Sequence, residues 1–333
     1  MNARIPVRWL HFARDTGIFR ALADALLFVG IPALLERYPQ ALHNFLALSN
    51  IQIKSPDVPT FTELTTVSYG PHRLQTMDIL TRSHTGGAAV VVGSNNTTNN
   101  KNNNKTLLFA HGGAWGSGRP WMYRLAAIPF LQQGYRVVMW GYRTYPDGLV
   151  QDQVDDLRSA LELLGPPNQI SVVGHSSGAH IAVLAALQQQ QQEASVFLCD
   201  KLVALSGVYD IPNHYEWETG RGVNEISALK PACGGTNMNW MDVSPTRILA
   251  AANHAATMPD MYVLHGARDT VVPYTSAVNL TRALLLSSKK KKGSVLSKCK
   301  LEILDHVEHS ETVLHLMMGG ASRDKVMDWL SSS

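Results

Sequence analysis

The sequence predicts an α/β fold, in which one mostly parallel sheet carries helices on both faces and opens with an antiparallel hairpin at its N-terminal end. The main observation is that short apolar, β-branched runs alternate with helical patterns from about residue 64 to the end. The length of 333 residues is about twice that of a ~150-residue domain and would allow two domains. Because the alternation runs through the whole of this range, we favour a single large domain.

The alternation places eight strands and five helices along the chain. Strands are expected at residues 65–69, 75–80, 107–110, 136–140, 170–173, 202–205, 261–264 and 301–304. Helices are expected at residues 120–133, 150–164, 178–190, 274–286 and 323–330. A strand followed by a helix and then by another strand is the pattern of parallel strands joined by crossovers.

Three polar, repetitive tracts interrupt this pattern at residues 94–105, 188–192 and 287–294. Such tracts cannot bury enough apolar surface to offset the entropy of ordering them. We therefore expect low-complexity insertions in surface loops or at helix ends.

The first 60 residues differ from the rest of the chain and are expected to form an N-terminal helical extension. Several arginines precede a largely apolar stretch at residues 21–35, which contains Asp24, Gly30 and Pro32. This stretch is shorter than the ~20 residues that a membrane-spanning helix needs. We favour helices that pack on the domain, and peripheral contact of residues 1–60 with a membrane surface stays open as the alternative.

Charge and cysteine content narrow the function classes. The 29 Lys plus Arg residues exceed the 26 Asp plus Glu residues by only three, so no nucleic-acid partner is expected. Cys199, Cys233 and Cys299 are too few and too scattered for a disulfide framework, and no C-x-x-C pair offers a metal or redox site. We expect an intracellular protein.

A serine stands where a strand meets a helix. Gly174-His175-Ser176-Ser177-Gly178 follows the strand expected at residues 170–173 and precedes a helical pattern. This is G-x-S-x-G in the strand–turn–helix context of a nucleophile elbow, where glycines leave room for the neighbouring strand and helix. We predict Ser176 as a nucleophile, with an ordinary Gly/Ser loop as the alternative. His175 and His180 are expected to orient neighbours or to pack.

A second glycine motif lies upstream. His111-Gly112-Gly113-Ala114-Trp115 directly follows the strand expected at residues 107–110. Acyl transfer places negative charge on the former carbonyl oxygen, which fixed N–H donors stabilise. We predict an oxyanion hole in which the backbone N–H groups of Gly113, Ala114 and Ser177 donate and Gly112 shapes the turn. His111 is expected to brace the loop, and a tight structural turn is the alternative.

A serine nucleophile needs a histidine base and an acid that orients it. Asp269 follows the strand at residues 261–264, at the edge where the sites of open α/β sheets gather. His306 and His309 both follow the last strand. We favour His309, which directly precedes the helix start at Ser310, and keep His306 in reserve. A metal cluster of His306, His309 and His315 lacks a supporting ligand spacing, so neither metal nor cofactor is expected.

These motifs resemble the esterase/lipase branch of the α/β-hydrolase superfamily over residues 64–330. The resemblance implies an eight-stranded sheet with a small cap at residues 207–257, in a catalytic domain of residues 61–333. Residues 142–148 (Y-R-T-Y-P-D-G) and 174–180 are similar to the isoprenylcysteine methylesterase group, whereas H-G-G-x-W is shared with kynurenine formamidases. One departure is Glu311, because resembling sequences often have Asp two residues after the base.

The resemblance implies a serine carboxylesterase that works through an acyl-enzyme without a cofactor. The implied substrate is a small apolar ester, with a prenylcysteine methyl ester as the specific candidate, and the implied location is the cytoplasm or an endomembrane. Two alternatives are an arylformamidase with the same triad and a non-catalytic hydrolase-fold binding protein, a class that typically lacks a triad residue. In the cap, two interpretations stay open, a substrate wall or packing, for the aromatic residues Tyr209, Tyr215, Trp217 and Trp240.

Overall fold

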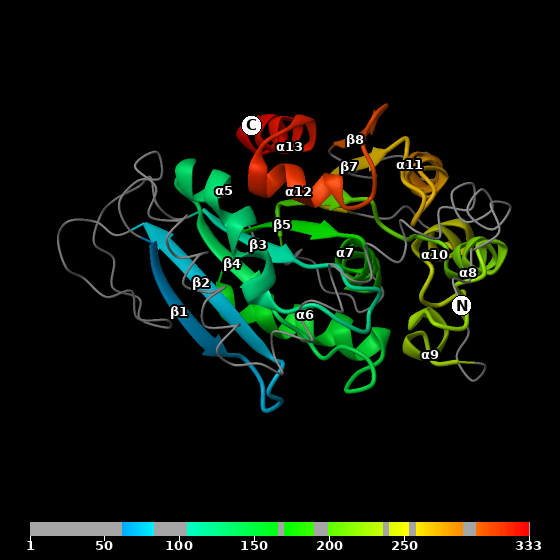
Figure 1. The fold of residues 1–333 in the computed structure, drawn as a ribbon, viewed down its shortest axis with the longest axis horizontal. Coiled ribbons are helices and arrows are strands. Elements are labelled where there is room, and N and C mark those ends of the chain that lie inside the picture. The colour runs from blue at the N-terminus through cyan, green and yellow to red at the C-terminus, as the bar shows by residue number, and fades with distance from the viewer. Residues whose placement is uncertain are drawn as a thin grey trace, which may run out of the picture.

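The computed structural model describes residues 62–82, 105–165, 170–189, 199–235, 240–252, 258–288 and 298–332. They form an eight-stranded sheet in the order β1-β2-β4-β3-β5-β6-β7-β8 (Figure 1). The strands are β1 (Thr62–Ser68), β2 (Thr76–Arg82), β3 (Thr106–Ala110), β4 (Arg136–Trp140), β5 (Ile170–His175), β6 (Lys201–Leu205), β7 (Asp260–Gly266) and β8 (Cys299–Leu304). All eight expected strands are present, with ends that differ from the prediction by up to three residues.

The sheet is antiparallel at one end and parallel elsewhere, which confirms the predicted fold class. β1 pairs antiparallel with β2, and β2 pairs antiparallel with β4. All the other pairs are parallel. The chain passes from β3 to β4 on one side of β3 and then crosses to β5 on its other side. The direction in which strands are added to the sheet therefore reverses at β3. A ligand site in an open α/β sheet lies outside the carboxyl ends of the strands at such a point.

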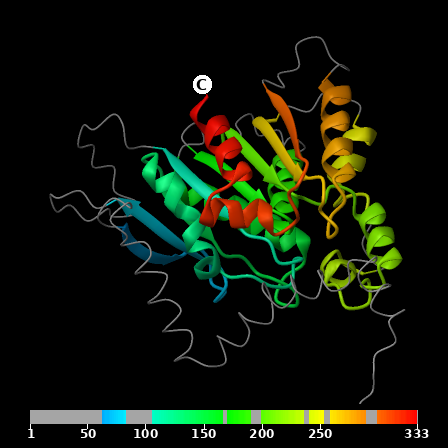
Figure 2. The same cartoon turned by 45° about the horizontal axis from the view of Figure 1, so that its top comes forward.

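Helices cover both faces of the sheet (Figure 2). They are η2 (Pro120–Ala127, a 3-10 helix), α5 (Ile128–Gln132), α6 (Val150–Leu164), α7 (Ser177–Gln189), α8 (Ile211–Gly220), α9 (Leu229–Ala232), α10 (Pro245–Ala251), α11 (Thr275–Ser288), α12 (Glu311–Met318) and α13 (Ala321–Ser331). Successive strand residues point to opposite faces. In β3, Leu108 packs in the core with α6, α7 and α11, whereas Leu107 and Phe109 pack in a second core with η2, α5, α12 and α13.

One predicted helix is broken. Residues 120–133 were expected to form a single helix, but the chain forms the 3-10 helix η2 and then the short α-helix α5. Pro129 stands in the first turn of α5. Since proline has no N–H and its ring clashes with the carbonyl of the residue four before it, it is tolerated at a helix start but not inside a helix. The expectation of one continuous helix was therefore wrong.

The predicted cap segment contains α8, α9 and α10. Asp210 caps the first turn of α8 by accepting a hydrogen bond from Asn213 N, which satisfies one of the N–H groups that a helix start leaves unpaired. The other carboxylate oxygen of Asp210 pairs with Arg247 on α10 at 2.6 Å. The start of α8 is therefore fastened to α10.

Several expectations concern residues outside the described ranges. The helical extension at residues 1–60 lies outside them, as do most of the tracts at residues 94–105, 188–192 and 287–294. The described ends of these tracts are Lys105, just before β3, and the last residues of α7 and of α11. In the part of the chain that the structure describes, no helix has the length and apolarity needed to cross a membrane.

Candidate active site

Ser176 is the single residue between the end of β5 and the start of α7. Its φ of 54° places it in the left-handed region, where a non-glycine residue costs about 1–3 kcal/mol unless its surroundings hold it there. Ser176 N donates to Leu205 O of β6 at 2.8 Å. This strained and anchored turn matches the predicted nucleophile elbow.

The two glycines of the elbow leave no space for a side chain. A methyl group on Gly178 would overlap the carbonyl oxygens of Ala110 and His111 at the end of β3. A methyl group on Gly174 would lie 2.7 Å from Ala179 Cα in α7. The steric role that the sequence predicted for these glycines is therefore confirmed by the packing.

Three side chains predicted to act together form one chain of hydrogen bonds. His309 Nε2 lies 3.0 Å from Ser176 Oγ, and His309 Nδ1 lies 2.8 Å from Asp269 Oδ2. All three are at least nine-tenths buried. Ser176, Asp269 and His309 follow β5, β7 and β8, so they meet at the carboxyl edge of parallel strands. His306 is exposed, which makes His309 the residue that the structure places beside Ser176.

Asp269 is held by groups that favour its charged form. Its Oδ1 accepts hydrogen bonds from Val271 N at 2.9 Å and Val272 N at 2.8 Å, and its Oδ2 lies 3.1 Å from His265 Nε2. Burial alone would raise the pKa of Asp269, but the charge of His309 and the hydrogen bonds from both histidines hold this pKa well below its ordinary value. Asp269 is therefore ionised beside His309.

His265 is a second partner of the acid, and the sequence analysis did not single it out. Its Nε2 also lies 2.9 Å from Val272 O, and its side chain is fully buried. Because His265 belongs to β7, its side chain links the end of this strand to Asp269 and Val272 in the loop that follows. The signal was present in the sequence, because His265 stands four residues before Asp269 across a turn.

The other histidines near the elbow brace backbone segments. His175 Nε2 lies 3.2 Å from His309 O, and His111 Nδ1 lies 2.8 Å from Gly112 O. The His111 ring stacks on Tyr123 and Tyr142, with centroids 5.4 and 4.5 Å away. Burial lowers the pKa of His175 to about 3 and that of His111 to about 4, so both rings are neutral near pH 7. The structure agrees with the bracing role predicted for His111.

The H-G-G-A-W loop lies directly against Ser176. A methyl group on Gly112 would lie 3.0 Å from Ser176 Cβ and 2.9 Å from His175 Nδ1. Beyond Gly112 the backbone takes positive φ angles of 138° at Gly113 and 49° at Ala114. Among the described residues, the N–H groups of Gly113 and Ala114 have no hydrogen-bond acceptor.

The N–H of Ser177 lies at the start of α7, directly after Ser176 in the chain. Ser177 is the first residue of α7, and the first N–H groups of a helix have no partner within it. The helix dipole also makes this end favourable for negative charge. The structure thus places Gly112 against Ser176, with Gly113 and Ala114 next in the same loop and Ser177 next to Ser176 in the chain. That their N–H groups form an oxyanion hole stays a prediction.

The cap contacts the loop that carries the acid. Trp217 Nε1 on α8 lies 3.2 Å from Thr270 O and 3.1 Å from Val271 O. Of the other cap aromatics, Tyr209 is fully buried in the core, and Tyr215 packs edge-on against Trp240 with ring centroids 5.1 Å apart. Packing is therefore the role of Tyr209.

Two buried titratable groups lie on α8. His214 Nε2 is 3.6 Å from Glu218 Oε1, and both side chains are buried. Burial, followed by the charge of His309, lowers the pKa of His214 to about 3. Burial raises the pKa of Glu218 to about 7, while Ser227 donates to it at 2.8 Å. Neither was singled out from the sequence.

The last of the three histidines considered for a metal cluster has a different partner. His315 Nδ1 on α12 lies 3.1 Å from Ser322 Oγ in the first turn of α13. Within the described ranges, no group of three His, Cys, Asp or Glu side chains is arranged to hold a metal ion.

Comparison with known proteins places this geometry in a family. The BD-FAE family model matches residues 95–284. A probable isoprenylcysteine alpha-carbonyl methylesterase of Oryza sativa subsp. japonica is 26% identical over 238 residues, which is 67% of this chain and 55% of that protein. Esterase LipC of Mycobacterium tuberculosis is 26% identical over 206 residues, which is 56% of this chain and 50% of that protein. The chain thus spans about half the length of the curated relatives it matches.

Solved structures share the fold at low sequence identity. The crystal structure of esterase B from Lactobacillus Rhamnosis has a TM-score of 0.62 at 17% identity and covers 90% of this chain and 93% of that chain. An esterase from the bacterial hormone-sensitive lipase family has a TM-score of 0.59 at 18% identity, covering 81% and 84%. Since the family model matches more than half of the chain, the chain belongs to the BD-FAE family, and it has the α/β-hydrolase fold.

Proposed function

We propose that the protein is a serine carboxylesterase that works through an acyl-enzyme. The observation that carries the proposal is the hydrogen-bond chain from Ser176 through His309 to Asp269, with distances of 3.0 and 2.8 Å. Ser176 Oγ attacks the ester carbonyl while His309 Nε2 takes the hydroxyl proton. His309 then protonates the leaving alkoxide, and Asp269 orients the imidazole and stabilises its cation. Water activated by His309 hydrolyses the acyl-enzyme and restores the Ser176 hydroxyl.

The charge that develops on the carbonyl oxygen is stabilised by backbone groups. The N–H groups of Gly113 and Ala114 on one side and of Ser177 on the other donate to this oxygen. Each such donor contributes about 10²–10³ in rate. The proposal is supported by the absence of any other acceptor for Gly113 N and Ala114 N within the described residues. In this mechanism no cofactor or metal takes part.

The substrate is a small ester with an apolar part, and a prenylcysteine methyl ester is the specific candidate. Two observations support it: the methylesterase names of several relatives and the low charged fraction of 17%. Such a substrate carries a long apolar tail that partitions into membranes. Contact of residues 1–60 with a membrane surface, inside the cell, is therefore part of this proposal.

An arylformamidase is the second candidate. It is favoured by the motif His111-Gly112-Gly113-Ala114-Trp115, and it would use the same three side chains on an N-formyl amide. A non-catalytic binding protein of this fold is disfavoured because the described triad is complete and hydrogen-bonded.

The serine mechanism is tested with a fluorophosphonate probe, which reacts with activated serine nucleophiles. The wild-type protein should be labelled, and Ser176→Ala should not be. A matched control is Ser206→Ala, because Ser206 is also buried, also has a positive φ and lies at the end of the adjacent strand β6. Equal labelling of wild type and Ser176→Ala would remove Ser176 as the nucleophile.

The substrate is tested by comparing rates side by side on a prenylcysteine methyl ester, N-formylkynurenine, and short and long acyl esters. A preference for the prenylcysteine ester, measured as kcat/KM, supports the specific candidate. A preference for N-formylkynurenine would replace the esterase proposal with the arylformamidase.

A further inference from the structure

The last two residues of the H-G-G-A-W loop have an unfavourable backbone conformation. Ala114 has a φ of 49° and Trp115 a φ of 60°, so two successive non-glycine residues lie in the left-handed region. Such a conformation persists only where the surrounding structure holds it. On the proposed function, this short segment also directs the N–H groups of Gly113 and Ala114. The contacts that hold Trp115 therefore bear on the oxyanion hole.

The main chain of Trp115 is held from α6 and from the loop that precedes it. Trp115 O accepts a hydrogen bond from Gln153 Nε2 at 2.9 Å and another from Tyr145 N at 2.9 Å. Gln153 lies in the first turns of α6 and is fully buried. Among the described residues its buried Oε1 has no hydrogen-bond partner, so here the side chain acts as a donor. A buried amide that uses only its donor is oriented by that one bond.

The side chain of Trp115 is held from α7. Trp115 Nε1 donates to His180 Nδ1 at 3.0 Å, and the two rings meet edge to face with centroids 5.5 Å apart. Because Nδ1 accepts, the proton of the neutral His180 ring is on Nε2, which donates to Val243 O at 2.8 Å. His180 lies one turn after Ser177 on α7. Trp115 thus links the two segments that supply the proposed oxyanion donors.

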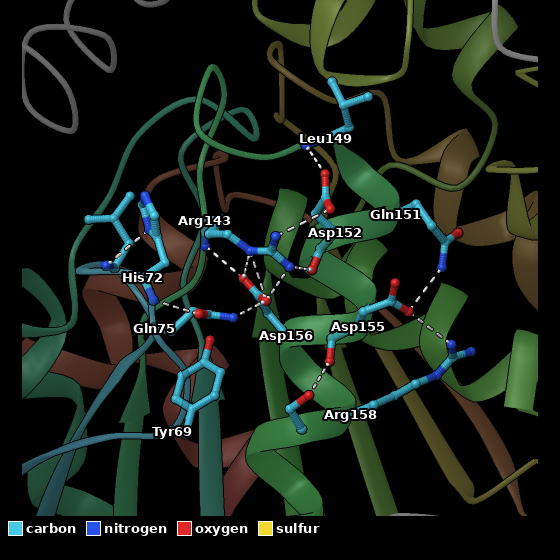
Figure 3. Close-up of polar contacts among 12 residues, drawn as sticks. Tyr69, His72, Gln75, Arg143, Leu149, Gln151, Asp152, Asp155, Asp156 and Arg158 are labelled. Atoms are coloured by element: carbon cyan, nitrogen blue, oxygen red, sulfur yellow. Dashed lines mark hydrogen bonds and ion pairs between the residues drawn. The ribbon is translucent and has the colours of Figure 1, made fainter.

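The start of α6 is itself fixed to the loop that follows β4 (Figure 3). Asp156, which is buried, accepts from Arg143 N at 2.9 Å and from the Arg143 guanidinium at 2.7 Å. Gln75 Nε2, from the turn between β1 and β2, donates to the same carboxylate at 2.7 Å. Asp152 accepts from Leu149 N at 2.8 Å at the helix start. Gln153 and Tyr145 therefore reach Trp115 from a rigid base.

We propose that Gln153 and His180 are positioning residues that hold Trp115, and through it the oxyanion loop, at a fixed place relative to Ser177. This role rests on the proposed esterase function. Neither residue touches the reacting atoms. A loop released from these bonds still folds and binds substrate, but it presents its N–H groups less well to the oxygen that becomes charged.

The test uses Trp115→Phe, which removes the indole donor and keeps an aromatic ring, and Gln153→Met, which keeps chain length and removes the amide. Three quantities are measured: kcat and KM on p-nitrophenyl acetate, the Ki of a trifluoromethyl ketone whose adduct carries an oxyanion, and Tm. We expect kcat to fall about 10- to 100-fold, as a misplaced group does, with KM nearly unchanged. The Ki should rise by a similar factor.

The matched control is Tyr135→Phe, which also removes one buried donor to a backbone carbonyl, that of Leu330, on the opposite face of the sheet. It should leave kcat and Ki unchanged. The inference is overturned if both test variants keep the wild-type kcat and Ki. It is also overturned if the test variants and Tyr135→Phe lose the same Tm and their kcat values change by the same factor. If wild type itself neither hydrolyses esters nor reacts with the fluorophosphonate, the proposed function has failed instead.

Discussion

At the scale of single residues, two neighbouring histidines have different environments. His309 is buried, contacts Ser176 and Asp269, and has its own carbonyl held by Thr312 Oγ1 at 2.7 Å. His306 lies three residues earlier in the same loop and is exposed. The loop therefore directs one imidazole into the site and the other into solvent.

This difference predicts the effect of two matched substitutions. His309→Ala should lower kcat on p-nitrophenyl acetate by about 10⁴-fold or more, because the serine loses its base and the leaving group its acid. His306→Ala should keep the wild-type rate. Steady-state kinetics of both variants, with circular dichroism to verify folding, provides the measurement. The reverse result would transfer the role of base to His306.

At the scale of elements, β3, β5 and α7 meet at the elbow with no spare volume. Ala110 and Gly174 are register partners in the parallel pair β3 and β5, so the H-G-G-A-W loop and Ser176 leave the sheet side by side. Gly178 lies where α7 crosses the end of β3. The separation of the oxyanion loop from the nucleophile is thus set by how closely this helix approaches the strand.

A side chain at Gly178 must push these elements apart. Gly178→Ala should lower the free energy of unfolding by about 1–3 kcal/mol, as overpacking does, and should also lower kcat. Gly220→Ala is the matched control, because a methyl group there meets no atom within 4 Å at the end of α8. Urea unfolding and ester kinetics measure both effects. A Gly178→Ala protein as stable and active as Gly220→Ala would contradict the close packing.

Strand positions followed from the sequence because short apolar runs such as Thr106–Ala110 are buried on both faces, which is a local signal. The break at Pro129 did not follow, because the apolar periodicity of residues 120–133 describes side chains and carries no sign of the N–H that proline lacks. Gln153 had no local signal, and His180 was expected only to orient neighbours or to pack, with no partner named. Their partner Trp115 lies 38 and 65 positions away in the chain, and only the fold brings them together.

At the scale of the whole molecule, buried titratable groups make stability depend on pH. Burial lowers the pKa values of four histidines, to about 4 for His111 and His180 and about 3 for His175 and His214. An unfolded histidine titrates near 6.5. Below that pH the unfolded chain binds protons that the native state does not, so the free energy of unfolding falls as pH drops from about 6.5 toward 4.

Each such histidine contributes a slope of about 1.4 kcal/mol per pH unit in this window. Glu218 acts in the opposite direction. Its pKa is raised by burial to about 7, so its contribution is fully present below the ordinary value of 4.5 and is lost as pH rises through 7. Between pH 4.5 and 6.5 the slope from Glu218 cancels the slope of about one of the four histidines. The free energy of unfolding therefore still falls as the pH is lowered.

Urea unfolding at several pH values tests this balance. His111→Phe keeps a ring stacked between Tyr123 and Tyr142 and removes one titrating group, so the slope below pH 6.5 should become shallower by about 1.4 kcal/mol per pH unit. Tyr142→Phe removes a hydroxyl bonded to His111 O without removing a histidine, and it should lower stability equally at every pH. Identical slopes for wild type and His111→Phe would contradict the prediction.

The contact between Trp217 and the acid loop limits how far the cap is an exchangeable module. The indole of α8 lies on the carbonyls of Thr270 and Val271, directly after the residue that orients the base. A cap grafted from a relative would replace the donor that these carbonyls use. An exchange of the cap that leaves the loop around Asp269 undisturbed therefore requires an indole donor to be kept at this position.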